Sequence, residues 1–584
     1  MTLKTLGPWP FLRRAGLASL MLLAGCTSID LAPWPSPVRE LAIDRAGDVQ
    51  TKPVTAQLAT LSPVPVMGAA SVTPAPTAES RPYSSAVAAR FPAPDRVYDT
   101  PGLSRGRSTW TSQAELTAWL HEQARQAERT ASGQAAVLTI GRSQEGLPIE
   151  ALVLTRGAGT DAASLKATGR PTVMLLAQQH GDAPASAEAL LVVARELTQG
   201  ELRPLLSRIN VLIVPRANPD GAAKAAHLTN NGFDMALDHL VLETPEAQAI
   251  AKLARDYQPT VVLDAQEYPA VGDFVDASSG LPKADAWVSY ATTPNLPEFL
   301  TKAADEWFLQ PLVSALTIQG LSSEWPYSIS TAKKAKTIAW ANLQPNNSVN
   351  ANALKNHISL TVASRGVGLK RAHSQRRVHT QVTAITSVLK STAERASELA
   401  QLKPYLDLEV IDQACQKDRV MEAQATPTRR TLQLLDANSG ADKPVTIETQ
   451  SVHLLRTVRT RVSPCGYWLK ANATQAVERL RLHGIQVMQV KDVAALLGDI
   501  YQAAVPVAGT LNLAATAPVE LLRGVVDAPA GSYYVPLNQA LGNMVFVALE
   551  PDSPNSYFSQ ALIDELSSVA RVMSQPAANL RELP

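Results

Sequence analysis

The chain has 584 residues, a formal net charge of +1 and 18% charged residues. This length exceeds what one ordinary hydrophobic core supports, so about two or three folded units are expected beside any unfolded segment. The near-neutral charge shows neither the basic surface of a nucleic-acid-binding protein nor an acidic solvating tail, and no nucleic-acid partner is expected.

Residues 1–25 have the pattern of an export signal. A positively charged start precedes a short apolar run, residues 15–24, which is too short to span a bilayer. The sequence Leu-Ala-Gly-Cys at residues 23–26 resembles a bacterial lipobox, which implies that Cys26 is acylated and anchors the chain to the membrane. Thr27 favours, by the same resemblance, the periplasmic face of the outer membrane. An ordinary secretory signal with an incidental Cys26 is the alternative.

Residues 26–97 are rich in proline, alanine, serine and threonine and show no sustained helical or strand period. Such a segment cannot bury enough apolar surface to offset the entropy of ordering it. We therefore expect a flexible tether up to residue 97, with folded structure beginning near Tyr98.

Residues 98–400 have the pattern of an α/β domain. A capping box, Ser112-x-x-Glu115, opens an expected amphipathic helix before the first apolar strand. The pattern predicts strands at 136–140, 149–154, 172–177, 209–214, 260–264 and 357–362, and helices at 186–197, 245–257 and about 376–399. Apolar strands that alternate with amphipathic helices predict a mixed, mostly parallel sheet with helices on both faces.

Residues 401–584 are expected to form a C-terminal α+β accessory region, because the hydrophobic pattern of the sequence changes beyond Pro404. Exposed strands are expected around 446–458, a short helix at 476–484 and a strand between turns at 531–537. The two cysteines of this region are Cys415 and Cys465. In an exported protein they are expected to form a disulfide, and two free thiols are the alternative.

Functional groups of open α/β sheets gather at the carboxyl ends of the strands, and four polar motifs follow expected strands here. They are His-Gly-Asp-Ala at 180–183, Arg-Ala-Asn-Pro-Asp-Gly at 216–221 with Asn-Gly-Phe-Asp-Met-Ala-Leu-Asp-His at 231–239, Asp-Ala-Gln-Glu at 264–267, and Ala-Ser-Arg-Gly at 363–366. In order, spacing and context they resemble the carboxypeptidase A-like zinc metallopeptidase family, in its bacterial branch. The resemblance covers roughly residues 98–399 and implies the zinc carboxypeptidase-like fold.

Members of that family hold a catalytic zinc ion through a His-x-x-Glu pair and a later histidine, and a separate glutamate accepts the proton of the attacking water. His180 occupies the first ligand position, but Ala183 and Gln266 occupy the other two. Ala363 stands at the position of the catalytic glutamate. The resemblance implies zinc as the cofactor, yet an amide is a poor zinc ligand, so these residues predict that zinc is not bound and that no catalytic residue remains.

The family's asparagine–arginine pair, which binds the terminal carboxylate of the substrate, aligns with Ala236 and Leu237. His227 is the nearest candidate for the place of a further family arginine. No substrate-binding residue is therefore assigned.

Other polar residues leave two alternatives open. A non-standard metal site could recruit carboxylates from Asp182, Glu188 or Glu267. A purely structural role, capping strand ends and pairing with one another, is expected for Asp238, His239, Arg216 and Arg365, and His180 has a similar alternative role as a hydrogen-bonded strand-end residue.

Three functions are compatible with this pattern. The first is a degenerate peptidase, a lipoprotein of the cell envelope that binds peptides or peptidoglycan fragments without cleaving them. The second is an active metallocarboxypeptidase or amidase with a non-standard metal site. The third is a structural envelope lipoprotein in which Ala236 and Leu237 fill the cleft.

Overall fold

The computed structural model describes residues 83–129, 133–271, 280–329, 338–340, 343–504 and 519–583. The export signal, Cys26 and most of the expected tether lie outside these residues. Within these ranges, no helix has the length and apolar character that crossing a membrane requires.

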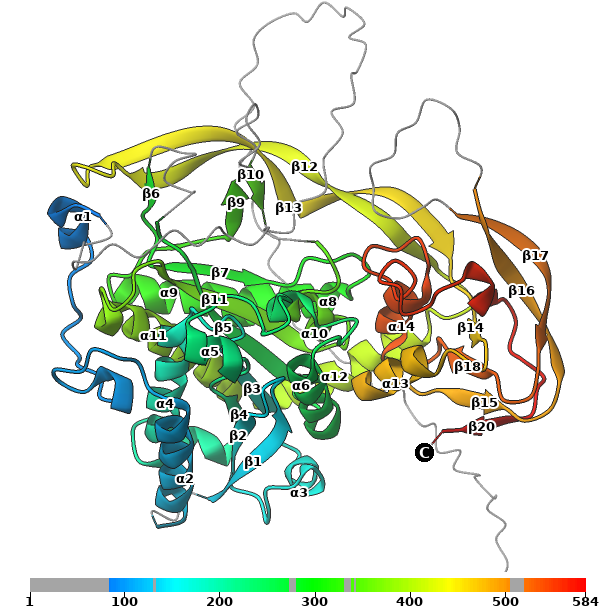
Figure 1. The fold of residues 1–584 in the computed structure, drawn as a ribbon, viewed down its shortest axis with the longest axis horizontal. Helices are drawn as coiled ribbons and strands as arrows, with labels where there is room; N and C mark the ends of the chain where they lie inside the picture. Colours follow the sequence, from blue (N-terminus) through cyan, green and yellow to red (C-terminus); the bar gives the residue numbers. More distant parts are fainter. Residues whose placement is uncertain are drawn as a thin grey trace, which may run out of the picture. The chain divides into compact units, whose positions relative to one another are not determined.

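An eight-stranded mixed sheet forms the centre of the first part of the chain (Figure 1). Its strand order is β1-β2-β4-β3-β5-β11-β7-β8, and the pairs β4–β3, β3–β5, β5–β11 and β7–β8 are parallel. The strands are β1 (Gln134–Arg142), β2 (Pro148–Thr155), β3 (Thr172–Ala177), β4 (Asn210–Val214), β5 (Val261–Pro269), β7 (Ala286–Tyr290), β8 (Ser323–Glu324) and β11 (Ile358–Val367). The predicted α/β class with a mixed, mostly parallel sheet is confirmed.

Helices cover both faces of this sheet because successive strand residues point to opposite sides. Val173 and Leu175 of β3 pack in one core cluster with residues of α4 (Pro184–Thr198) and α11 (Ser374–Glu394). Met174 and Leu176 pack in another cluster with residues of α6 (Pro245–Tyr257). All side chains of β3 are buried, which explains its uninterrupted apolar sequence.

The remaining helices of this part are short or lie at its edges. They are α1 (Ser85–Ala89), α2 (Gln113–Arg129), α3 (Ala162–Ala167), α5 (Pro219–Lys224), α8 (Glu298–Ala303), α9 (Gln310–Ile318) and α10 (Ser348–Ala353), with a π-helical turn at Ala304–Leu309.

The predicted capping box at the start of α2 is confirmed. The Ser112 N–H donates to Glu115, and the Glu115 N–H donates to the Ser112 hydroxyl.

Two predictions about element boundaries are wrong. The long helix expected at about 376–399 is two helices, α11 and α12 (Ala396–Ile411), and Pro404 lies inside α12. Residue 400 therefore lies within a helix. Order also begins before Tyr98, since Val87 and Phe91 are buried against Leu281 and Leu435.

The C-terminal part contributes to two further sheets. One has the order β6-β12-β13-β10-β9 and is built on the long hairpin of β12 (Asp418–Leu435) and β13 (Asp442–Val462), drawn in yellow in Figure 1. Its other strands come from the earlier part of the chain: β6 (Leu281–Pro282), β9 (Tyr327–Ile329) and β10 (Ile338–Trp340). Residues on both sides of position 400 thus share one sheet.

The other sheet has seven strands in the order β17-β16-β19-β14-β18-β15-β20. The strands are β14 (Gly466–Leu469), β15 (Met488–Val490), β16 (Ala494–Ala503), β17 (Val519–Ala528), β18 (Tyr533–Pro536), β19 (Val569–Val572) and β20 (Leu580–Glu582), and the helices are α13 (Thr474–His483) and α14 (Gly542–Leu549). The expected disulfide is present, with the Cα atoms of Cys415 and Cys465 4.4 Å apart. It joins the chain beyond α12 to the start of β14.

Candidate functional site

The loop after β3 lies against the segment that follows β4, because these parallel strands end at the same edge of the sheet. Gly181 packs directly on the backbone of Gly221, and a Cβ atom at Gly181 would collide with the Gly221 carbonyl group. The Asn218 side chain caps α5 by accepting the Gly221 N–H at 2.9 Å. The glycine of the His-Gly-Asp-Ala motif is thus required for the close approach that positions His180.

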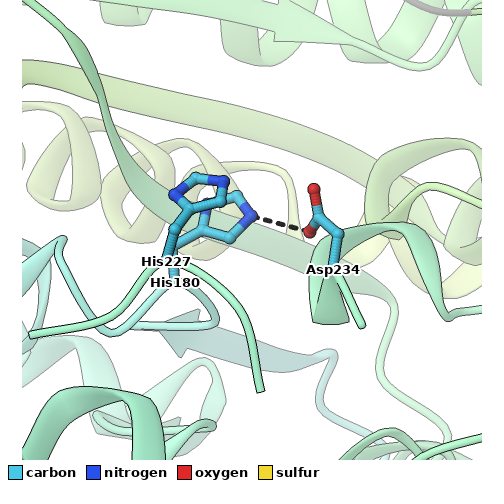
Figure 2. A group of neighbouring side chains, drawn as sticks. All are labelled: His180, His227 and Asp234. Carbon is cyan, nitrogen blue, oxygen red and sulfur yellow. Dashed lines mark hydrogen bonds and ion pairs between the residues drawn. The ribbon is translucent and has the colours of Figure 1, made fainter. Parts of the chain in front are cut away.

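Two histidines and one aspartate meet at this edge (Figure 2). His180 Nε2 donates a hydrogen bond to Asp234 Oδ1 at 2.8 Å, and the His227 ring stacks on the His180 ring with centroids 3.8 Å apart. One potential ligand atom from each of the three side chains lies within 4.8 Å of the other two. We call His180, His227 and Asp234 the His–His–Asp cluster.

A second carboxylate lies beside this cluster. His227 Nδ1 donates to Asp182 Oδ1 at 3.1 Å. Burial opposes the charged form of His227, but the hydrogen bond and charge of Asp182, together with the charge of Asp234, outweigh it and raise the pKa of His227. Burial likewise opposes ionisation of Asp234, yet the hydrogen bond from His180 and the charges of both histidines hold the pKa of Asp234 below its ordinary value. The cluster therefore favours an ionised Asp234.

The positions at which the family binds zinc do not present a zinc donor set. Ala183 has no donor atom and lies buried directly before α4. Gln266 turns its amide to Asp264, donating from Nε2 to Oδ2 at 2.6 Å. Ala363 is the register neighbour of Gln266 on β11, so no carboxylate stands at the position of the catalytic glutamate. The residues at these family positions do not fit a zinc ion.

The alternative in which Glu267 replaces a metal ligand disagrees with the structure, because this carboxylate is hydrogen-bonded elsewhere. It pairs with Arg377 through two contacts of 2.7 and 2.9 Å and accepts the Ala185 N–H at 2.9 Å. Adjacent strand residues face opposite sides of the sheet, so Glu267 points away from the face of Gln266. A Cβ atom at Gly366 would collide with this carboxylate, which explains the glycine of the Ala-Ser-Arg-Gly motif.

The Glu188 carboxylate is also occupied by structural hydrogen bonds. It lies buried on α4 and accepts hydrogen bonds from the Thr100 hydroxyl and from the N–H and hydroxyl of Thr111. Of the three carboxylates considered as substitute ligands, only Asp182 lies beside the histidines, and it contacts His227.

Asp238 and His239 cap local backbone and neighbouring loops. Asp238 accepts the N–H groups of Glu243 and Thr244, and His239 Nε2 donates to Gln179 Oε1 at 2.6 Å. Burial lowers the pKa of His239 to about 3, so its imidazole is neutral.

Arg216 and Arg365 also have separate partners. Arg216 donates to Gln178 Oε1 and to the Thr111 carbonyl, and Arg365 donates to the Pro282 carbonyl while lying 4.1 Å from the centroid of the Phe91 ring. The expected structural role of Asp238, His239, Arg216 and Arg365 agrees with these contacts. None of the contacts described here joins two of these four residues, so their expected pairing with one another is not found.

The substrate-carboxylate positions have become apolar without closing the site. Ala236 is buried and donates its N–H to Asp234 Oδ1 at 3.0 Å. Leu237 is 41% exposed and Phe233 is 44% exposed. Leu237 therefore lies toward solvent, which disagrees with the alternative in which Ala236 and Leu237 fill the cleft.

The sequence contained one unused signal for this cluster. Asp234 is the aspartate of the family's Asp-x-Asn-Arg motif and is retained although the two residues after Met235 are apolar. The sequence places His227 near the position of a family arginine and does not indicate its contact with His180. The contact of both residues with His180 is a tertiary feature, and no local period in the sequence indicates it.

Comparison with known proteins identifies carboxypeptidases among the relatives of this chain. The peptidase M14 family model, described as zinc carboxypeptidase, matches residues 120–414. Carboxypeptidase 2 of Trichophyton rubrum is 24% identical over 515 residues, covering 84% of this chain and 91% of the fungal protein. Carboxypeptidase D of Mus musculus is 39% identical over 107 residues, covering 16% of this chain and 8% of the mouse protein. A metallo-carboxypeptidase of Burkholderia cenocepacia aligns with a TM-score of 0.35 and 17% identity, covering 48% of this chain and 69% of that chain.

Proposed function

The chain belongs to the zinc carboxypeptidase family, and we propose that it is a catalytically degenerate member that binds peptides or peptidoglycan fragments at the cell envelope without hydrolysing them. The observation that carries this proposal is the state of the family's reacting positions. Ala183 and Ala363 offer neither a metal ligand nor a proton acceptor, and the Gln266 amide is turned to Asp264. At these family positions, the residues that the structure describes therefore supply neither a zinc ligand set nor a glutamate that could activate water.

The surroundings of the His–His–Asp cluster support ligand binding. The His227 and Asp234 side chains are 36% and 28% exposed, so solvent reaches polar groups there. Phe233 and Leu237 expose apolar surface on the same loop. Polar groups beside exposed apolar side chains suit a peptide segment. The asparagine and arginine that bind a free terminal carboxylate in the family are replaced here, so this chain lacks that contact.

We expect the purified full-length chain, supplied with zinc, to release no amino acid from peptide C-termini and to cleave no muropeptide above the rate of its His180→Ala variant. Binding of the same ligands should be measurable by calorimetry. Phe233→Ala should weaken that binding by about tenfold, since a buried aromatic contact contributes of the order of 1 kcal/mol or more.

Tyr405→Ala provides the matched control for Phe233→Ala, because Tyr405 is an aromatic residue of similar exposure, 42%, on α12. The Tyr405→Ala variant should bind these ligands with the same affinity as the parent chain. Hydrolysis that disappears in His180→Ala would refute the degenerate assignment. Equal ligand binding by the Phe233 and Tyr405 variants would refute the proposed binding surface.

We also propose that Cys26 carries the lipid anchor and that the folded part lies at the periplasmic face of the outer membrane. Support comes from Leu-Ala-Gly-Cys at residues 23–26 and from Thr27. In cells fed a labelled fatty acid, the chain should incorporate label and fractionate with the outer membrane, whereas Cys26→Ala should lose both properties. Label retained by Cys26→Ala would contradict the anchor, and label in the inner-membrane fraction would contradict the location.

A further inference from the structure

We propose that His180, His227 and Asp234 form a binding site for a single divalent transition-metal ion, displaced from the position at which the family holds zinc. The site goes beyond the proposed function, because that function requires no metal ion. Only His180 is shared with the family's ligand positions, and the other two ligands are new in this role. The inference depends on three features: the meeting of the two loops, the orientation of the imidazoles and the chemistry of the donor set.

The donors are brought together by two loops that the fold fixes against each other. His180 lies in the loop between β3 and α4, and His227 and Asp234 lie in the loop after α5. The backbone contact between Gly181 and Gly221 ties the start of α5 to the His180 loop. Asp234 also accepts the Ala236 N–H, which fixes its side chain at the start of a short 3₁₀ turn, Met235–Leu237. The cluster is therefore built on anchored backbone.

The donor atoms lie near enough to one another for one ion to bind all three after the side chains adjust. With ligand bonds of about 2.0–2.1 Å, donor atoms around zinc lie about 3.4 Å apart. The ligand atoms of the cluster lie within 4.8 Å of one another, and the Nε2–Oδ1 distance between His180 and Asp234 is 2.8 Å. The two imidazole rings are stacked with an angle of 17° between their planes, so one ring must turn before both imidazoles can bind one ion. With that turn and side-chain shifts of about an ångström, a metal ion replaces the hydrogen-bonded proton between His180 and Asp234, and the proton is released to solvent.

Asp182 orients the second imidazole. Metal-binding histidines commonly donate their other ring N–H to a carboxylate, which fixes the tautomer and directs the lone pair to the metal. His227 Nδ1 donates to Asp182 at 3.1 Å, so Nε2 is the nitrogen left to bind an ion. Asp182 thus acts as a positioning residue for His227.

Two imidazole nitrogens and one carboxylate oxygen select the class of ion. This set suits zinc and neighbouring first-row transition metals, whereas calcium and magnesium prefer sites made of oxygen ligands. The partial exposure of His227 and Asp234 leaves solvent access for a fourth ligand, a water molecule or a group of a bound ligand. Ala363 supplies no proton acceptor, so the proposed site would bind an ion but lack the family's catalytic glutamate.

The test uses the tag-free full-length chain, stripped with a chelator, dialysed and titrated with zinc chloride in a calorimeter. One equivalent of zinc should bind and should raise the melting temperature of the chain. His227→Gln and Asp234→Asn should each abolish stoichiometric binding and the rise in melting temperature. Asp182→Asn should weaken binding by about 10–100-fold, the range for loss of a carboxylate that orients a ligand.

Two control variants distinguish this site from zinc binding elsewhere on the chain. Gln266→Ala removes the side chain at the family's own ligand position, and His121→Gln removes an exposed histidine on α2. Both should bind zinc as the parent does. Circular dichroism in the absence of metal should show that His227→Gln and Asp234→Asn are folded. A variant that fails this check is replaced by His227→Asn or Asp234→Ser.

Three results would overturn the inference: no stoichiometric zinc in the parent chain, equal binding by the parent and folded His227→Gln, or loss of binding in Gln266→Ala. The first result would mean that the cluster is only a pair of stacked imidazoles, each hydrogen-bonded to an aspartate. None of these results bears on hydrolysis, which the peptide assay measures separately. If the chain neither binds zinc nor hydrolyses peptides, the proposed metal site is refuted and the assignment as a degenerate peptidase stands.

Discussion

Replacing Arg377 by methionine is expected to lower the free energy of unfolding by about 3–5 kcal/mol, the range for removing one partner of a buried ion pair. The side chains of Arg377 and Glu267 are 3% and 0% exposed and make two contacts of 2.7 and 2.9 Å. Without the guanidinium, Glu267 keeps the hydrogen bond from the Ala185 N–H but loses its charged partner while its side chain is fully buried. Urea unfolding followed by circular dichroism measures the loss.

The pair Arg429–Glu448 offers the matched control. Its contact is 3.1 Å long, but its side chains are 77% and 81% exposed. Arg429→Met should therefore change the free energy of unfolding by less than about 1 kcal/mol. Similar losses in the Arg377 and Arg429 variants would contradict the role of burial. The double variant Arg377→Met with Glu267→Met should be more stable than Arg377→Met alone, because it leaves no unpaired buried charge.

This ion pair lies beside one of the family's zinc-ligand positions but does not depend on the residue there. Glu267 follows Gln266 on β5, yet Glu267 holds β5 to α11 while Gln266 faces the opposite side. The first contact stabilises the domain whatever happens at the reacting positions. Residues at the metal and catalytic positions can therefore change while the strand that carries them keeps its place.

Breaking the disulfide should have an effect of similar size. The bond between Cys415 and Cys465 closes a loop with a sequence separation of 50 residues. In the chain-entropy model, opening such a loop in the unfolded state costs about 4 kcal/mol of stability. Cys465→Ser should show this loss in urea unfolding under oxidising conditions.

A reductant separates the cross-link from the packing of the buried Cys465 side chain. The reduced parent chain should unfold at nearly the same urea concentration as Cys465→Ser, and the reductant should not change the variant further. A parent chain whose unfolding is insensitive to complete reduction would show that the cross-link does not contribute. A variant much less stable than the reduced parent would assign the loss to packing instead.

Local signals in the sequence determined most of the central domain. The bounds of β3 and α6 agree with the predicted ranges, because an uninterrupted apolar run marks a strand buried on both faces and Thr244 caps a helix with proline at its first turn. The capping box at Ser112 was predictable for the same reason, since its partners are three residues apart. Family resemblance added the identity of the positions at Ala183, Gln266 and Ala363.

Contacts between distant residues were decided only by the tertiary structure. Pro404 is accommodated within α12, whose Leu399, Leu402 and Leu406 are buried, so packing outweighs the local cost of proline. Residues 83–97 are ordered in part because Val87 and Phe91 find apolar partners far along the chain. The stacking of His227 on His180 has the same origin: sequence periodicity records which face of an element is buried, but not which loops meet at the end of a sheet.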